Sequence, residues 1–71
     1  MSLRIFKDNG RQFGAEFKYM DAPRSTRSMH QVIEDLQLDH LWVLYPGNKS
    51  YPIAPNITAL PLTDLPRFKQ T

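Results

Sequence analysis

Leu41-Trp42-Val43-Leu44-Tyr45 is an uninterrupted run of five apolar or aromatic residues, bounded by Asp39-His40 before it and by Pro46-Gly47 after it. A short apolar run between turn-forming residues is typical of a strand that is covered on both faces. Trp42 and Tyr45 could stack on nucleic-acid bases, but their place inside this run favours a role in the core. The run therefore predicts a central strand of a sheet.

The residues before this strand predict one amphipathic helix. Ser28 is an expected N-cap, since Gln31 three residues later completes a capping box, and Thr26 is the competing cap. The apolar residues of the segment recur at the spacing of a single helix face: Met29, Val32, Ile33 and Leu36. We expect this face to pack on the sheet.

A hairpin is predicted ahead of the helix. Asn9-Gly10 separates residues 3–7 from residues 12–19, and both of its residues tolerate the positive φ of a type I′ turn. The order of strand, helix and buried strand further implies a parallel β-α-β crossover between residues 12–19 and 41–45, which is right-handed in nearly all proteins.

Short elements are expected beyond the central strand. Residues 50–53 predict an edge strand, because Pro52 lacks an amide donor, and residues 57–60 predict another. Thr63 could cap a last helical turn over Thr63-Asp64-Leu65, before a polar tail at residues 67–71 that we expect to be frayed. The predicted fold class is α/β, with α+β as the alternative: one domain over residues 1–66, with a small mixed sheet and one main helix on one face.

Composition limits the functions that this chain can perform. It has 71 residues, no cysteine and a net charge of +2, so disulfides and thiolate metal sites are excluded and charge alone does not indicate nucleic-acid binding. A chain of this size buries only about 60–65% of its unfolded surface, so a partner surface would stabilise it. Since the first residues lack the apolar run of a signal peptide or membrane span, we expect a cytoplasmic protein.

Glu16 and Lys18 are the candidate catalytic residues. In an alternating strand they share one face, where a carboxylate could hold Mg²⁺ and an ammonium could stabilise charge developing on a phosphate. The simpler alternative is an ion pair or two solvated charges on an exposed face, worth about 0–1 kcal/mol. Both interpretations follow from the spacing.

Several short motifs, in their order along the chain, carry a resemblance to a known family. They are Gly14-Ala15-Glu16-Phe17-Lys18, Asp21-Ala22-Pro23-Arg24, Ser28-Met29, Glu34-Asp35-Leu36, Leu38-Asp39, Tyr45-Pro46-Gly47, Tyr51-Pro52 and Ala59-Leu60-Pro61-Leu62. The series resembles the C-terminal PD-(D/E)XK nuclease-like domain of a prokaryotic AAA-type ATPase family. The resemblance implies a truncated restriction-endonuclease-like core, with Glu16 as the acidic position, a weak metal ligand, and Lys18 as its companion.

The sequence departs from that family pattern in two places. No Gly-x-x-x-x-Gly-Lys phosphate loop is present, so ATPase activity is not implied for this chain. The second acidic residue of the family's site is expected near Ser2, and a hydroxyl does not replace a carboxylate. Asp8 lies in the predicted turn and Asp21 beyond the strand, so neither is placed to substitute for it.

Arg24 and Arg27 form the candidate anion- or nucleic-acid-binding group, with Lys18 beside them. They precede the predicted helix, whose N-terminus favours anions, although either arginine could instead pair with Asp21 or Glu34. His30 and His40 are too far apart and too poorly accompanied to indicate a zinc site.

Together with this resemblance, the sequence predicts a non-catalytic interaction module, similar to a truncated C-terminal nuclease-like domain of an AAA-type ATPase. We expect no cofactor, and a partner that is either a second copy, giving a homodimer, or another protein covering the open face of the sheet. The alternative is a Mg²⁺-dependent nuclease or DNA-binding module whose second carboxylate comes from a partner chain.

Overall fold

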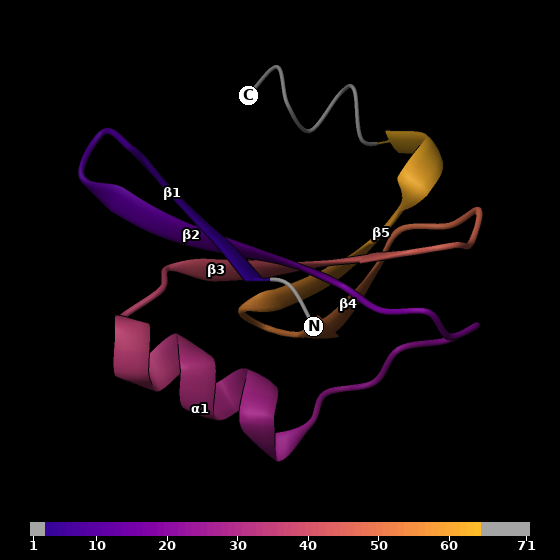
Figure 1. Cartoon of the computed structure of the whole chain (residues 1–71), viewed down its shortest axis with the longest axis horizontal. Coiled ribbons are helices and arrows are strands. Elements are labelled where there is room, and N and C mark those ends of the chain that lie inside the picture. The colour runs from indigo at the N-terminus through magenta and orange to yellow at the C-terminus, as the bar shows by residue number, and fades with distance from the viewer. Residues whose placement is uncertain (1–2, 65–71) are drawn as a thin grey trace.

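A computed structural model describes residues 3–64 as one five-stranded mixed sheet with one helix against it (Figure 1). The strands are β1 (Leu3–Asp8), β2 (Arg11–Phe17), β3 (His40–Tyr45), β4 (Tyr51–Ala54) and β5 (Ile57–Pro61). The helices are α1 (Arg27–Leu36) and a single 3-10 turn, η1 (Leu62–Asp64). The mixed α/β sheet with one main helix is confirmed.

The predicted hairpin and crossover both form. β1 and β2 pair antiparallel from Leu3 opposite Glu16 to Asp8 opposite Arg11. Asn9 and Gly10 between them take φ of 54° and 81°, the left-handed values that a type I′ turn requires. β2 then pairs parallel with β3, and α1 lies on the connection between them.

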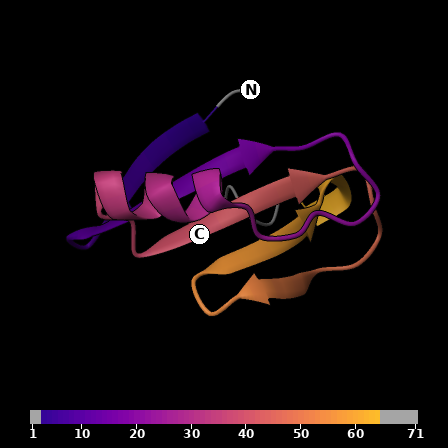
Figure 2. The same ribbon diagram turned by 90° about the horizontal axis from the view of Figure 1, so that it is seen from below.

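The second half of the sheet is arranged by a second hairpin. β5 pairs parallel with β3 on one side and antiparallel with β4 on the other, so the strand order is β1-β2-β3-β5-β4. β4 is an edge strand, as Pro52 predicted, and its pairing with β5 is irregular between Pro52 and Ala54. Figure 2 shows this order, with β1 and β4 at opposite edges.

The core lies between α1 and the face of the sheet that it covers. Leu41 and Val43 of β3 are fully buried there, while Trp42 and Leu44 on the opposite face are only half-buried. Within residues 3–64, the expectation that β3 is covered on both faces is therefore met in full on the α1 face and in part on the opposite face. The buried cluster contains Met29, Ile33, Leu38, Leu41, Val43 and Ile57.

The start of α1 differs from the first expectation. Thr26, not Ser28, is the N-cap: its backbone is extended and its Oγ1 accepts a hydrogen bond of 3.2 Å from the Met29 amide. The Gln31 side chain does not reach back to the cap but donates to Asp35 at 2.9 Å. The capping box at Ser28 is wrong because the helix already begins at Arg27, which places Ser28 inside the first turn.

The apolar stripe of α1 is also narrower than predicted. Met29 and Ile33 are buried and Val32 packs beside them, whereas Leu36 is 39% exposed. At the other end of the chain, the predicted last turn begins one residue early, with Thr63 inside η1. Leu65, the domain boundary at residue 66 and the tail at residues 67–71 lie outside the described residues.

Candidate functional site

Glu16 and Lys18 lie at the carboxyl end of β2, on the side of the sheet that α1 covers. Glu16 is opposite Leu3 of β1 and Val43 of β3, and only 6% of its surface is exposed. Lys18 follows the strand, and its amide donates to the Leu44 carbonyl at 2.8 Å. The Lys18 Nζ lies 3.5 Å from Glu16 Oε1.

This geometry corrects the expectation that the two charges stand on an exposed face. Glu16 and Lys18 form an ion pair, as the simpler alternative expected, but the Glu16 carboxylate is buried against the core. Such a carboxylate depends on its countercharge, since removing one partner of a buried pair leaves an uncompensated charge. Lys18 is therefore the neutralising partner of Glu16.

The other candidate metal ligands do not join Glu16. Asp8 is in the hairpin, paired with Arg11 across the strands, and Asp21 is exposed in the loop beyond β2. Within residues 3–64, no three His, Asp or Glu side chains are grouped as a metal site would need. Ser2, which stands near the expected acidic position, lies outside the described residues.

The loop between β2 and α1 is fastened to β4 through Pro23. Pro23 is fully buried, and the Tyr51 hydroxyl donates to its carbonyl at 2.7 Å. Burial raises the pKa of Tyr51, nearby Tyr45 adds to this, and the positive charge of Arg24 opposes it. The positive charge of Arg24 therefore acts on the Tyr51 hydroxyl.

The predicted basic group is only partly assembled. Arg24 and Arg27 are both exposed, one in the loop and one in the first turn of α1. Neither forms an ion pair with another of residues 3–64, so the pairing with Asp21 or Glu34 is not seen. Both side chains are exposed, but no described contact brings them together into one site.

The two histidines differ in their surroundings. His30 is exposed on α1, whereas His40 is half-buried at the start of β3, with its Nε2 2.7 Å from Thr58 Oγ1 and its ring 4.5 Å from that of Trp42. Burial lowers the pKa of His40 from its ordinary value of 6.5. The sequence did not reveal this position, because the partner Thr58 belongs to β5.

The face of the sheet opposite α1 is the main candidate interaction surface. The sequence predicted that a partner would cover such a face, but not which residues form it. We call it the open face; its large apolar side chains are Phe6, Phe13, Phe17, Trp42, Leu44 and Leu60. The rings of Phe6 and Phe13 stack at 5.5 Å, and Phe6 is 36% exposed. Among residues 3–64, α1 is the only helix longer than one turn, and Figure 1 shows it on the other side of the sheet.

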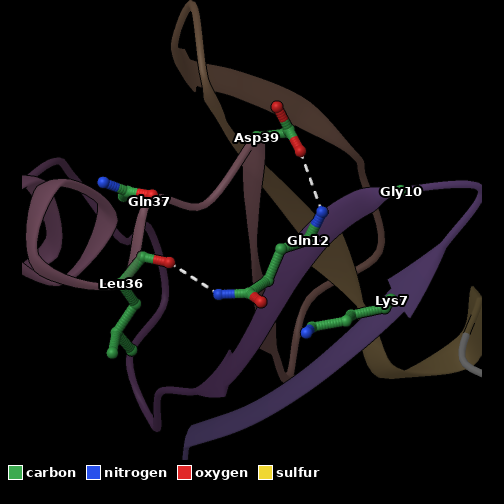
Figure 3. A pocket seen from close by; sticks show the side chains of 6 residues that line it. All are labelled: Lys7, Gly10, Gln12, Leu36, Gln37 and Asp39. Carbon is green, nitrogen blue, oxygen red and sulfur yellow. Dashed lines mark hydrogen bonds between the residues drawn. The ribbon is translucent and has the colours of Figure 1, made fainter.

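A shallow pocket of about 270 Å³ lies between the hairpin and the end of α1 (Figure 3). Gln12 lines it and makes two hydrogen bonds: the side-chain amide donates to the Leu36 carbonyl at 2.6 Å, and the backbone amide donates to Asp39 Oδ2 at 2.8 Å. Lys7 also lines it. These hydrogen bonds connect the β1–β2 hairpin to the end of α1 and to Asp39, so the pocket has a structural explanation.

The fold and the candidate site define a small mixed α/β protein with an aromatic sheet face and a buried Glu–Lys pair. The chain is 38% identical over 53 residues to an uncharacterized protein of Mycobacterium tuberculosis and, to the same extent, to one of Mycobacterium bovis. The match covers 75% of this chain but only 12% of each relative.

Two further comparisons found no match. No family model matches the chain, and no solved structure does. Among residues 3–64, the helices are too short and too polar to cross a bilayer.

Proposed function

We propose that this chain is a non-catalytic interaction module, a shortened nuclease-like domain of the kind found in AAA-type ATPases, which docks through its open face onto a larger protein. The observation that carries the proposal is the open face itself. An antiparallel or mixed sheet normally buries one face and solvates the other with polar residues, yet here the second face presents stacked aromatic rings.

The relatives indicate what the occupant would be. The matched segment is 12% of each mycobacterial protein, so in those proteins it is joined to a polypeptide several times its own length. The rest of that polypeptide, being covalently attached, would bury an apolar sheet face. We therefore take the partner to be a protein of the same kind as the remainder of the mycobacterial relatives.

The Glu16–Lys18 geometry supports a binding role over a catalytic one. Lys18 already neutralises the Glu16 carboxylate at 3.5 Å, and Mg²⁺ would have to displace that ammonium to gain one buried oxygen ligand. In this proposal, the pair is the retained trace of a nuclease-like site within a truncated restriction-endonuclease-like core.

The direct test uses the M. tuberculosis relative with its matched segment removed. We expect the intact 71-residue chain to bind that body in isothermal titration calorimetry. Phe17→Ser and Leu60→Ser, both on the open face, should weaken binding about tenfold or more, since each removes roughly 1.5–3 kcal/mol of apolar burial. Leu36→Ser is the matched control, because Leu36 is an exposed apolar residue on α1, across the sheet from the open face.

Two results would contradict the docking proposal. One is the absence of binding at about 100 μM, a concentration at which even a weak complex of roughly −5.5 kcal/mol is half formed. The other is equal binding by the open-face variants and the Leu36 control. A chain ending at residue 64 that binds more tightly than the full chain would instead identify residues 65–71 as the occupant.

The alternative, a Mg²⁺-dependent nuclease or DNA-binding module, is favoured by one observation: Glu16 and Lys18 lie together at the end of β2. Backbone amide shifts during titration with Mg²⁺ and with short DNA test it. Shifts in residues 14–28 that disappear in Glu16→Gln and Lys18→Ala would support it. If neither ligand moves these residues, the nuclease proposal is rejected.

A further inference from the structure

The two edges of the sheet are protected to different degrees. β4 has four residues, contains Pro52, and pairs irregularly with β5, all of which disfavour the addition of another strand. β1 has six residues without proline and pairs with β2 in unbroken register from Leu3 to Asp8. The β1 edge is therefore the one able to accept a strand.

The outward backbone groups of β1 fall at alternate residues. In an antiparallel ladder, every second residue directs its N–H and C=O toward the neighbouring strand, and the rest point away from it. Counted from the Asp8–Arg11 pair that closes the two-residue turn, the residues that point away include Ile5 and Lys7. Ile5 is also 42% exposed, and no other described strand lies beyond β1, so within residues 3–64 this edge presents outward-pointing backbone groups and apolar surface.

The side chains of β1 suggest which strand would fit. Arg4, Phe6 and Asp8 alternate along the open face, with opposite charges at the ends and an aromatic ring at the centre. A strand of the same sequence, added antiparallel and centred on Phe6, places each Arg4 opposite the Asp8 of the other copy. The edge is thus self-complementary in charge.

Other registers lose this complementarity. Centring the pairing on Ile5 would place Arg4 opposite Phe6 and Leu3 opposite Lys7, which leaves no pair of opposite charges among residues 3–8. A shift by one residue would direct matching side chains to opposite faces of the sheet. Only the register centred on Phe6 pairs both charged residues of the open face and keeps all faces aligned.

We propose that a second copy of this chain adds its β1 antiparallel to β1, centred on Phe6, and joins two five-stranded sheets into one continuous sheet. The two Phe6 rings then face each other at a non-hydrogen-bonded pair, where side chains approach most closely. They extend the Phe6–Phe13 stack, 5.5 Å between ring centres, across the two-fold axis. This interface goes beyond the docking proposal, because it uses the β1 edge and does not involve Phe17 or Leu60 of the open face.

The association should be weak. One strand pair buries less surface than the roughly 1,200 Å² of a stable complex, so we expect a dissociation constant of about 10–500 μM. Sedimentation equilibrium of the full chain over about 10 μM to 1 mM covers this range. The dimer should weaken as salt is added, because two exposed Arg–Asp pairs contribute to it.

Charge exchange tests the register. Arg4→Asp places two acids opposite each other at both ends of the interface, and Asp8→Arg places two bases there, so each variant should dimerise at least about fivefold more weakly than the parent chain. An equimolar mixture of the two should regain dimer formation, because the mixed pair restores opposite charges at both ends. The double variant Arg4→Asp/Asp8→Arg should regain it as well. Lys49→Asp, in the turn after β3, is the control and should dimerise like the parent.

Two outcomes would overturn the β1 interface. The first is a monomer at all concentrations. The second is a dimer that the single charge variants leave unchanged, or that their mixture fails to restore, since such a dimer uses another surface. Neither outcome bears on the open-face variants at Phe17 and Leu60, so failure of this interface is distinct from failure of docking. Far-ultraviolet circular dichroism of each variant separates lost pairing from lost folding.

Discussion

Glu16 Oε1 lies 3.5 Å from Lys18 Nζ on the side of the sheet that α1 covers, with the carboxylate buried and the lysine side chain 23% exposed. The asymmetry between the two partners matters for stability. A lysine can extend its ammonium toward water, whereas a carboxylate on a central strand cannot move. Glu16 therefore depends on Lys18 more than Lys18 depends on Glu16.

Substitution of the lysine should accordingly destabilise the fold more than substitution of the acid. We expect Lys18→Met to lower the free energy of unfolding by about 2–3 kcal/mol, because the carboxylate is left buried without a countercharge. Glu16→Gln should lower it by only about 1 kcal/mol. Urea denaturation measures both. The double variant should be more stable than Lys18→Met alone, and equal, small effects of the two single changes would show that the pair is solvated.

The N-cap of α1 gives a second prediction with a built-in comparison. Thr26→Ala removes the Oγ1 that accepts from the Met29 amide, so unfolding should become easier by about 1 kcal/mol. Ser28→Ala keeps the Thr26 cap and removes only the exposed contact of 3.0 Å between Ser28 Oγ and Thr26 Oγ1, so it should change stability by less than about 0.5 kcal/mol. Thermal denaturation of the two variants compares them directly. A larger loss of stability for Ser28→Ala than for Thr26→Ala would mean that Ser28 caps the helix, as the sequence suggested.

The sequence predicted the parts of the fold that local chemistry determines. Asn9-Gly10 identified the hairpin, Pro52 identified an edge strand, and the apolar run at residues 41–45 identified the central strand. Each of these depends on φ preferences, on a missing amide, or on hydrophobic patterning, all of which are present in the residues themselves.

What the sequence did not predict depends on contacts between distant residues. Nothing local places β5 between β3 and β4, and the end of α1 is unmarked because Gln37 takes the left-handed conformation that glycine usually adopts. The burial of Glu16 follows from Leu3 and Val43 on its two neighbouring strands. A spacing of two residues fixes that Glu16 and Lys18 share a face, but not which face α1 covers.

Gly14 supplies a third prediction, since β2 must let Leu38 approach its backbone. A Cβ at position 14 would lie 2.7 Å from Leu38 Cδ1 and 3.1 Å from Leu41 Cδ1. Gly14→Ala should therefore destabilise the protein by about 1–2 kcal/mol in urea denaturation, despite the usual gain from replacing glycine.

Leu38 provides the control for this steric argument. In a background of Leu38→Ala, the contact at 2.7 Å is removed, so adding Gly14→Ala should have less effect than it has in the parent chain. The double-mutant cycle measures the difference. Strictly additive effects would show that the contact with Leu38 is not what excludes a side chain at position 14.

The last prediction concerns pH and the open face. His40 lies there between Phe13 on β2 and Thr58 on β5, beside the Trp42 ring, with no carboxylate among these contacts. Burial holds its pKa below the ordinary value of 6.5, so the folded state binds its proton less readily than the unfolded chain does. The resulting stability is fully present above about pH 6.5 and is lost as the pH falls from there through the lower folded pKa. Urea denaturation between about pH 8 and pH 5 should show this fall in the parent and in His30→Gln, but a smaller one in His40→Gln. If the His30 variant loses the pH dependence and the His40 variant keeps it, the pH dependence does not come from His40 on the open face.

Because a docked partner would bury His40 further, binding through the open face should weaken over the same pH range. The titration of His40 is in this way linked to the proposed function.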